Sequence, residues 1–371
     1  MVEKVTDGRV HIEERRGWGV LTLDRPTTLN ALSHHMVRTV SSALARWRTD
    51  PSIRAVLIKA VPGKAFCAGG DIRVVVEAAR EGGSAAAARF FADEYQMNWR
   101  IGTLGKPYVA LIDGITMGGG IGISVHGTHR IATERTVVAM PETAIGFFPD
   151  VGGSYFLPRL PSRIGLYLGL TGARIDGATA TRLGIATHLV PSAGLEELTA
   201  SLLDGAPLAE ALERHSEEPQ PSGLDVPAIV QHFAGDDLAA ILASLAAASG
   251  HESGSASDEP SDSASSEAGD KFAAATLATL RARSPLSLRV VMDQLARGRQ
   301  LDLAGCLAME YRMVHHFLEA SDFAEGVRAV VIDKDKQPRW RHDRIEAVPE
   351  AEVEACFAPV PGAELVLDWQ S

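Results

Sequence analysis

The chain has 371 residues, of which 46% are hydrophobic and 22% charged, a composition typical of a soluble globular protein. Its net charge of −11 argues against the basic face of a general nucleic-acid binder. Apolar runs such as "PYVALI" are far shorter than the roughly 20 residues of a membrane span. The three cysteines are widely spaced and lack a metal-binding pattern, and no signal segment is visible. We therefore expect a cytoplasmic protein with reduced thiols, no metal site, and neither nucleic acid nor membrane as a partner.

The first 200 residues alternate between strand-like and helix-like segments. Ser33 can cap the first helix, and a turn at Arg16-Gly17 separates the first two strands. The expected elements, in chain order, are strands within 9–26, a helix to about residue 49, a strand at 54–60, a helix over about 85–102, and strands within 106–114, 129–134 and 136–142. Short buried strands in this alternation predict an α/β core with many parallel strands.

From about Ser162 the pattern becomes mostly helical. Residues 248–270 are rich in Ser, Gly and acids and contain almost nothing apolar, so burial cannot offset the entropy of ordering them. We therefore predict a core over residues 1–200 and a mostly helical region over residues 201–371, interrupted by a disordered loop at about 248–270.

Two glycine-rich turns each follow a buried strand and precede a helix, "AFCAGGDIR" and "DGITMGGGIG". Helix N-termini offer free N–H groups, and two such turns side by side could form an oxyanion hole. Close strand–helix packing alone explains the glycines equally well. The GxGxxG, P-loop and GxSxG patterns are all incomplete, which argues against a nucleotide site of these types and against a serine hydrolase.

The stretch "MPETAIGFFPDVGG" places Glu142 and Asp150 among apolar residues. Buried carboxylates are costly unless they have a partner or a task, and apolar walls would raise their pKa into the range of acid–base catalysis. A bend through Ile145-Gly146 could bring both to one cavity. Alternatively, Asp150 caps a helix starting near Gly152, and Glu142 accepts backbone N–H bonds.

Four segments resemble, in order, the enoyl-CoA hydratase/isomerase (crotonase) superfamily: "LDRPTTLNALS", "AFCAGGDIR", "DGITMGGGIGIS" and "MPETAIGFFPDVGGSYFLPRL". Together with the tail "DFAEGVRAVVIDKDKQPRW", they are most similar to its 3-hydroxyisobutyryl-CoA hydrolase branch, over about residues 8–340. The resemblance implies an α/β fold with a crotonase-like ββα superhelical core and a helical C-terminal region. It also implies a homo-oligomer, a trimer or a hexamer.

The resemblance further implies an acyl-CoA substrate and no separate cofactor, because CoA is part of the substrate. Its thioester oxygen would accept backbone N–H bonds from Gly70 and Gly119. Asp71 would start the helix behind the first donor and lie in the substrate-binding region. The stretch that contains Leu29 and Ala31 would lie near the adenine end of CoA.

Hydratases of this family have a glutamate at the position of Gly122, and most have glycine at the position of Asp150. Here the glutamate of the "PE" pair is kept as Glu142. Gly122 would clear room beside the thioester for a branched acyl group or a water. Glu94 matches a substrate-contacting acid of the hydrolase branch, although a solvated helix face is an alternative.

The resemblance thus implies a thioester hydrolase that acts on 3-hydroxyisobutyryl-CoA or a close 3-hydroxyacyl-CoA, as in valine catabolism. Glu142 would act as nucleophile or general base, and Asp150 would orient the 3-hydroxyl or shuttle protons. An enoyl-CoA hydratase/isomerase is an alternative that the glycine at position 122 disfavours. A non-catalytic acyl-CoA-binding subunit is a second alternative, since fold alone does not exclude it.

Overall fold

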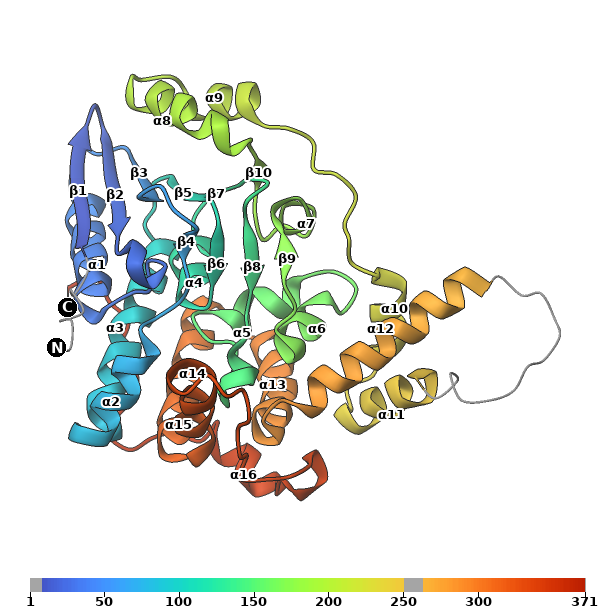
Figure 1. Ribbon diagram of the computed structural model, residues 1–371. Helices are drawn as coiled ribbons and strands as arrows, with labels where there is room; N and C mark the ends of the chain where they lie inside the picture. The colour runs from blue at the N-terminus through green and yellow to red at the C-terminus, as the bar shows by residue number, and fades with distance from the viewer. Residues whose placement is uncertain (1–8, 250–262, 371) are drawn as a thin grey trace.

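The computed structural model describes residues 9–249 and 263–370 (Figure 1). Within them, strands form a six-stranded sheet, order β1-β2-β3-β5-β7-β10, and a four-stranded sheet, order β4-β6-β8-β9. The pairs β1–β2 and β8–β9 are antiparallel, and the other pairs are parallel, which confirms the predicted core with many parallel strands. The strands are β1 (Arg9–Arg15), β2 (Trp18–Asp24), β3 (Ala55–Ala60), β4 (Ala65–Cys67), β5 (Tyr108–Ile112), β6 (Ile115–Met117), β7 (His129–Ala132), β8 (Val137–Ala139), β9 (Ile175–Asp176) and β10 (His188–Leu189).

The strands repeat in pairs that divide between the two sheets. In β3-β4, β5-β6 and β7-β8 the first strand joins the larger sheet and the second joins the smaller one. Because β4 and β6 are parallel neighbours, the turns that follow them lie at the same edge of the smaller sheet. The fold therefore places the two glycine-rich turns next to each other.

The helices follow the strands in the expected order. The Ser33 hydroxyl caps α1 by accepting a hydrogen bond from the N–H of Met36 at 3.2 Å. The helices before residue 190 are η1 (Pro26–Thr28), α1 (His34–Thr49), α2 (Ile72–Gly82), α3 (Ser84–Gly102), α4 (Gly119–Val125), η2 (Glu142–Ile145), α5 (Gly153–Phe156), η3 (Leu157–Arg159), α6 (Ile164–Thr171) and α7 (Gly177–Arg182). In the described ranges, no helix combines the length and the apolar composition that crossing a bilayer requires.

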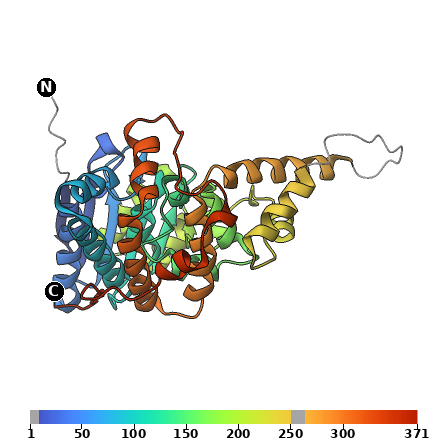
Figure 2. The same ribbon diagram turned by 90° about the horizontal axis from the view of Figure 1, so that it is seen from below.

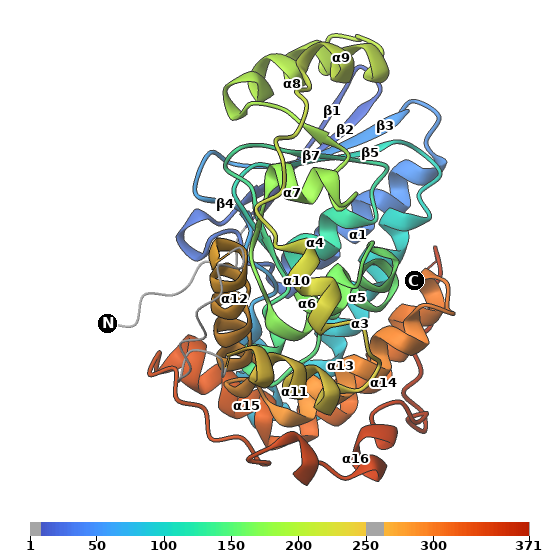
Figure 3. The same cartoon turned by 90° about the vertical axis from the view of Figure 1, so that its right-hand side faces the viewer.

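The boundary between the core and the helical region does not lie at residue 200, where it was predicted. The later elements are η4 (Ser192–Gly194), α8 (Leu195–Leu203), α9 (Leu208–His215), α10 (Val226–His232), α11 (Leu238–Ser249), α12 (Ser263–Arg281), α13 (Pro285–Gly298), α14 (Leu303–Glu319), α15 (Ser321–Val327), η6 (Arg328–Ile332), η7 (Ile345–Ala347) and α16 (Glu350–Ala355). The predicted boundary cuts through α8. Leu198 and Leu202 of that helix pack with Leu57 and Val109 of the larger sheet, so α8 and α9 belong to the core (Figure 3).

The C-terminal part of the loop predicted at 248–270 is helical. Residues 250–262 lie outside the described residues, but α12 begins at Ser263. Ala273, Leu277 and Leu280 of α12 are buried, and α12 packs along α11. A helix anchored by such packing extends into the polar residues that precede its apolar face, although their composition alone indicates a loop. The two helices project together from the body of the molecule (Figure 2).

Candidate active site

The two glycine-rich turns approach each other closely after β4 and β6. A Cβ atom on Gly119 would lie 3.0 Å from the amide nitrogen of Gly70, and one on Gly69 would lie 3.9 Å from the amide nitrogen of Gly119. Any larger side chain at Gly119 would therefore crowd the neighbouring turn. Among the described residues, no backbone carbonyl accepts a hydrogen bond from the N–H of Gly70 or of Gly119. Two free N–H groups on adjacent turns meet the requirement for an oxyanion hole.

A cavity of about 210 Å³ opens beside these turns. Five of the predicted site residues line it, namely Gly70, Gly119, Glu94, Glu142 and Asp150. Its apolar walls come from α2, α3, η2 and the segment after η2, and from η6 near the C-terminus. The apolar residues that these elements contribute are Ile72, Phe90, Phe91, Ala144, Ile145, Phe147, Val330 and Val331, and Ala68, Met117 and Pro141 line the cavity beside the two turns and η2. The predicted pair of acids therefore shares one small, largely apolar cavity with the two turns.

Glu142 is the first residue of η2, and its side chain is buried. Its Oε2 has no hydrogen-bond partner among the described residues, and a Cβ on Gly118 would lie 2.9 Å from its Oε1. Burial, and then the charge of Asp150, raise the pKa of Glu142 well above its usual range. A carboxyl group with one free oxygen, Oε2, is therefore held next to the second glycine-rich turn, and the alternative that Glu142 only accepts backbone N–H bonds does not account for this oxygen.

Asp150 is also buried, and its Oδ2 accepts a hydrogen bond of 2.9 Å from the hydroxyl of Tyr95. Burial raises its pKa to about 7, although the bond from Tyr95 opposes the shift. The helix-cap alternative is wrong, because Gly152 occupies the N-cap of α5 and no side chain caps that helix. Asp150 thus titrates near neutral pH at the cavity wall.

Glu94 lies on the buried face of α3, so the alternative of a solvated helix face is wrong. Its Oε1 has no hydrogen-bond partner among the described residues and lies 3.8 Å from the position of a Cβ on Gly70. Burial, and then the charge of Asp150, raise the pKa of Glu94 well above its usual range. The cavity therefore contains three carboxyl groups that cannot all be ionised at low cost.

Gly122 does not have the environment that the sequence suggests. It does not line the cavity, and a Cβ at this position would lie 2.6 Å from Cβ of Val151 and 3.0 Å from Oδ1 of Asn98. The space beside Gly122 is thus filled by protein, and the expectation of free room for a branched acyl group or a water is wrong. The glycine instead allows α3 and the segment after Asp150 to pack against α4.

The other predicted binding residues lie behind or beside the cavity. Asp71 occupies the N-cap position of α2, but its carboxylate forms a 2.8 Å ion pair with buried Arg25 and does not line the cavity. The same guanidinium donates to the carbonyl of Ala31 at 3.0 Å. Leu29 is 36% exposed and lines a separate hollow of about 340 Å³ with Asn30 and Lys64. Asp71 and Ala31 thus connect to the first turn through Arg25, and Leu29 borders the neighbouring hollow.

Several site residues were not predicted from the sequence. Tyr95 follows Glu94 directly, but nothing in the local pattern indicates that its hydroxyl reaches a residue 55 positions later. Val330 and Val331 line the cavity from the C-terminal region. Both lie within the tail "DFAEGVRAVVIDKDKQPRW", whose resemblance to the hydrolase branch could have indicated a role at the site. Phe90 and Phe91 on α3 complete the walls.

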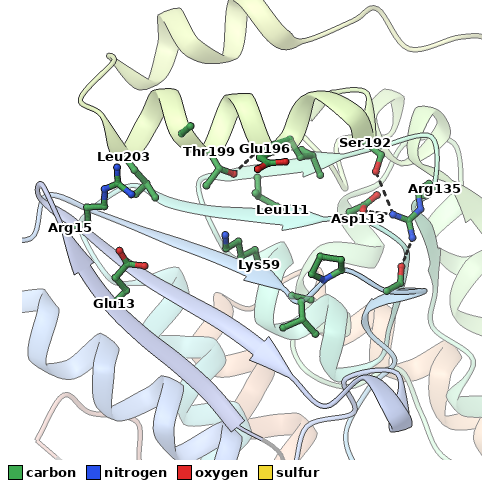
Figure 4. Close-up of a pocket in the computed structure, with 16 residues that line it drawn as sticks. Glu13, Arg15, Lys59, Leu111, Asp113, Arg135, Ser192, Glu196, Thr199 and Leu203 are labelled. Carbon is green, nitrogen blue, oxygen red and sulfur yellow. Dashed lines mark hydrogen bonds and ion pairs between the residues drawn. The ribbon is translucent and has the colours of Figure 1, made fainter.

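A larger cavity, of about 620 Å³, lies between the larger sheet and α8 (Figure 4). Arg135 pairs with Asp113 at 2.8 Å on one side, and Arg15 pairs with Asp204 at 2.9 Å on the other. Neither glycine-rich turn opens into this cavity. Arg15, Asp113 and Arg135 thus form ordinary ion pairs, and size alone does not make this cavity the reactive site.

One group of acids in the described residues has the spacing of a cation site, Asp293 with Glu350 and Glu354. Glu350 and Glu354 already form ion pairs with Arg289 and Arg297. Glu350 and Glu354 are exposed, Asp293 is half-buried, and all three lie outside the acyl cavity, so the group is best explained as a surface ion-pair network.

Comparisons with known proteins agree with this geometry. The sequence pattern of the enoyl-CoA hydratase/isomerase family matches residues 18–357. A mitochondrial 3-hydroxyisobutyryl-CoA hydrolase of Xenopus laevis is 43% identical, over 98% of this chain and 92% of that protein. The 3-hydroxyisobutyryl-CoA hydrolase 1 of Arabidopsis thaliana is 41% identical, over 97% and 94%.

Solved structures give the same fold under other names. A carnitinyl-CoA dehydratase from Mycobacterium thermoresistibile is 39% identical with a TM-score of 0.86, over 98% of this chain and 99% of that one. An enoyl-CoA hydratase from Rhodobacter sphaeroides is 39% identical with a TM-score of 0.83, over 96% and 99%. The predicted crotonase-like α/β fold is therefore confirmed. The chain belongs to the enoyl-CoA hydratase/isomerase family and, within it, to the 3-hydroxyisobutyryl-CoA hydrolase branch.

Proposed function

We propose that this chain is a thioester hydrolase that cleaves 3-hydroxyisobutyryl-CoA, or a close 3-hydroxyacyl-CoA, to the free hydroxy acid and CoA in valine catabolism. The relatives named for this activity span nearly the whole chain. The observation that carries the proposal is the pairing of Glu142 with a Tyr95-bound Asp150 in one small cavity beside two free backbone N–H groups.

In the proposed mechanism, the thioester oxygen binds between the N–H groups of Gly70 and Gly119. These donors stabilise the negative charge that develops on this oxygen when the carbonyl carbon is attacked. Glu142, next to the second turn, attacks that carbon or removes a proton from the attacking water. The carbon–sulfur bond breaks, the sulfur of CoA takes up a proton, and water supplies the second oxygen of the product acid.

Asp150 is proposed to orient the substrate through its 3-hydroxyl group. The Tyr95 hydroxyl donates a hydrogen bond to Oδ2. The other lone pairs of the carboxylate can accept a hydrogen bond from the hydroxyl of a 3-hydroxyacyl chain. Because the pKa of Asp150 is about 7, the same group can also pass a proton to or from the reacting atoms at neutral pH. Glu94, beside both glycines, is proposed to contact the acyl end of the substrate.

The hollow beside Leu29 is proposed to hold the adenine end of CoA. It is lined by Leu29, Asn30 and Lys64, and the N–H of Ala68 bonds the carbonyl of Leu29 at 3.0 Å. This bond connects the hollow to the first glycine-rich turn, and one ligand is proposed to extend from the hollow to the cavity. The Lys64 ammonium supplies a positive charge for a phosphate group.

Hydration of an enoyl-CoA is the second candidate function, because the two solved structures carry dehydratase and hydratase names. Position 122 is glycine here, and Val151 and Asn98 fill the space where a longer side chain would lie. The two-glutamate arrangement of the family's hydratases is therefore incomplete in this chain, which favours hydrolysis.

A free-thiol assay over a panel of acyl-CoAs tests the proposal. We expect the fastest CoA release from 3-hydroxyisobutyryl-CoA and related 3-hydroxyacyl-CoAs. Hydration of crotonyl-CoA well above the rate of thioester hydrolysis would favour the second candidate. If both activities are missing while acyl-CoA still binds, the chain is a non-catalytic binding subunit.

Assembly and location remain predictions. The proposed homo-oligomer, a trimer or a hexamer, can be measured by light scattering of the purified protein. The relatives from Xenopus and human are named mitochondrial, so cell fractionation has to decide the proposed cytoplasmic location of this chain.

A further inference from the structure

Asp150 lies on a segment with unusual backbone geometry. Val151 has φ +51° and Gly152 has φ +86°, so two successive residues are in the left-handed region. For a β-branched residue this conformation is strained and persists only where surrounding contacts fix it. The strain lies immediately after the residue that is proposed to orient the substrate, so the contacts of this turn determine where the Asp150 carboxylate points.

The carboxyl group of one residue on α14 binds the backbone of this turn. Glu310 is fully buried, and its Oε2 and Oε1 accept hydrogen bonds from the N–H groups of Gly152 at 2.8 Å and Ser154 at 2.9 Å. Burial raises the pKa of Glu310 to about 8, although the bonds from Gly152 and Ser154 lower it. A buried acid without a lysine or arginine partner is expensive, so its two bonds to this turn need an explanation.

A second buried side chain, from α13, binds both ends of the same turn. The Nε2 of Gln294 donates to the carbonyl of Pro149 at 2.5 Å and to the hydroxyl of Ser154 at 2.8 Å. On a third side, the ring Nε2 of His126 donates to the carbonyl of Val151 at 2.7 Å. The backbone around Asp150 is thus bonded on both sides of that residue, by helices far away in the sequence.

We propose that Glu310 and Gln294 are positioning residues for the carboxylate of Asp150. They fix the left-handed turn, and the turn directs the carboxylate toward the Tyr95 hydroxyl and the acyl cavity. Neither residue lines the cavity, so their effect on the reaction passes through Asp150. The inference rests on the proposed function, because it takes Asp150 to be the group that contacts the substrate.

A double-mutant cycle tests the positioning role. We expect Glu310→Gln to lower kcat about 10- to 100-fold with KM within about twofold, because Gln keeps the volume but offers only one acceptor to two N–H groups. In an Asp150→Asn background, the same change should lower kcat less than about twofold. An equal loss in both backgrounds, or a change confined to KM, overturns the inference.

Two further variants separate positioning from loss of folding. Gln294→Met removes the other contact with similar volume, and we expect the same non-additive pattern at about 3- to 10-fold. It provides the test if Glu310→Gln does not fold. The control is Asp302→Asn, since exposed Asp302 caps the same helix α14 through the N–H of Gly305 at 2.7 Å but lies off the turn. We expect its kcat to equal the wild-type value.

The reaction that the wild type catalyses tests the proposed function, and the additivity of the mutant cycle tests the inference, so the two can fail separately. The cycle is measured on whichever acyl-CoA reaction the wild type catalyses. If the wild type is a hydratase and the cycle is non-additive, the proposed function is overturned but the positioning role stands. A hydrolase with an additive cycle does the opposite, and a chain that transforms no acyl-CoA overturns both.

Discussion

Two groups of three carboxyl side chains differ in their partners: one lines the acyl cavity without a cation, and the other surrounds an arginine of η6, the element that contributes Val330 and Val331 to the cavity wall. The first consists of Glu94, Glu142 and Asp150, which are 2%, 7% and 5% exposed. Among the described residues their one side-chain hydrogen-bond donor is the hydroxyl of Tyr95. Burial raises the pKa of all three, so protons stay on some of them at neutral pH.

The second group surrounds Arg328 on η6. The guanidinium donates to Glu325 at 2.8 and 2.9 Å, to Asp333 at 2.7 Å and to Asp335 at 2.7 Å. These bonds lower the pKa of Glu325 and Asp335 and raise that of Arg328. The guanidinium thus pairs with all three carboxyl groups and favours the charged forms of Glu325 and Asp335. These four residues are called the arginine hub.

The difference separates two uses of the same side chain. Carboxyl groups without a cation cost folding stability but can exchange protons at neutral pH, which catalysis requires. Carboxyl groups around Arg328 are bound to its guanidinium instead, and these bonds hold the segment that brings Val330 and Val331 to the cavity. One group supplies reactivity and the other supplies shape.

The largest effect is expected from Glu142. We expect Glu142→Gln to lower kcat about 10³-fold or more, because an amide neither attacks the thioester carbon nor removes a proton. CoA release in a thiol assay measures the rate, and isothermal titration with a non-hydrolysable acyl-CoA thioether measures binding separately.

The matched control for this change is Glu134→Gln. Exposed Glu134 accepts a hydrogen bond from the N–H of Ser192 at 2.9 Å, away from the cavity, and the variant should keep wild-type kcat. A Glu142→Gln enzyme with more than about a tenth of the wild-type kcat would remove Glu142 from the reaction.

The next largest effect is the pH dependence that Asp150 gives to the wild type. Its carboxylate form is needed to accept the substrate hydroxyl, and its pKa is about 7. We therefore expect kcat/KM to level off above pH 7 and to fall about tenfold per unit below it. Asp150→Asn should be slower by about 10²-fold, and its acid limb should move to lower pH, because Glu142 then titrates without the charge of Asp150 beside it. A variant that keeps the limb near pH 7 would assign the titration to another group.

The core, the two glycine-rich turns and two of the cavity acids could be predicted from the sequence, because the patterns that indicate them are local. Strand–turn–helix order and glycine spacing indicate the core, and apolar neighbours mark Glu142 and Asp150 as acids that need a role. The parallel pairing of β4 with β6 then brings Gly70 and Gly119 together.

The rest depends on contacts between residues that are distant along the chain. Tyr95 reaches Asp150, and Glu310 reaches Gly152, only after α3 and α14 pack against the core. Gly122 was misread for the same reason, since a glycine in a sequence does not reveal whether Val151 fills the space beside it. The absence of a side chain indicates close approach, but not which group approaches.

A smaller effect concerns the stability cost of the group without a cation. An ordinary aspartate titrates at 3.8, whereas Asp150 titrates at about 7 in the folded chain, which therefore binds more protons between these values. The contribution of Asp150 to folding stability is thus fully present below about pH 4, and it is lost as the pH rises from there through 7. We expect Asp150→Asn to raise the free energy of unfolding by roughly 1 to 3 kcal/mol at pH 8 and by nothing at pH 4. Urea unfolding at both pH values measures it, and a loss of stability at pH 8 would contradict the assigned cost.

The smallest effect is expected from the arginine hub. Arg328→Gln removes the charge that gathers Glu325, Asp333 and Asp335, so the segment with Val330 and Val331 closes the cavity less well. Since no group of the hub touches the reacting atoms, we expect KM to rise about 3- to 10-fold and kcat to stay within about twofold.

Arg312→Gln is the matched control for the hub. Arg312 donates to Oε1 of Glu364 at 3.0 Å and to its Oε2 at 2.7 Å and does not border the cavity, so its loss should leave KM unchanged. If Arg328→Gln instead lowers kcat as strongly as Asp150→Asn, the hub contributes to the chemistry and the division between reactivity and shape fails. If both arginine variants leave KM unchanged, Val330 and Val331 keep their places without the hub, and packing against η2 alone holds them.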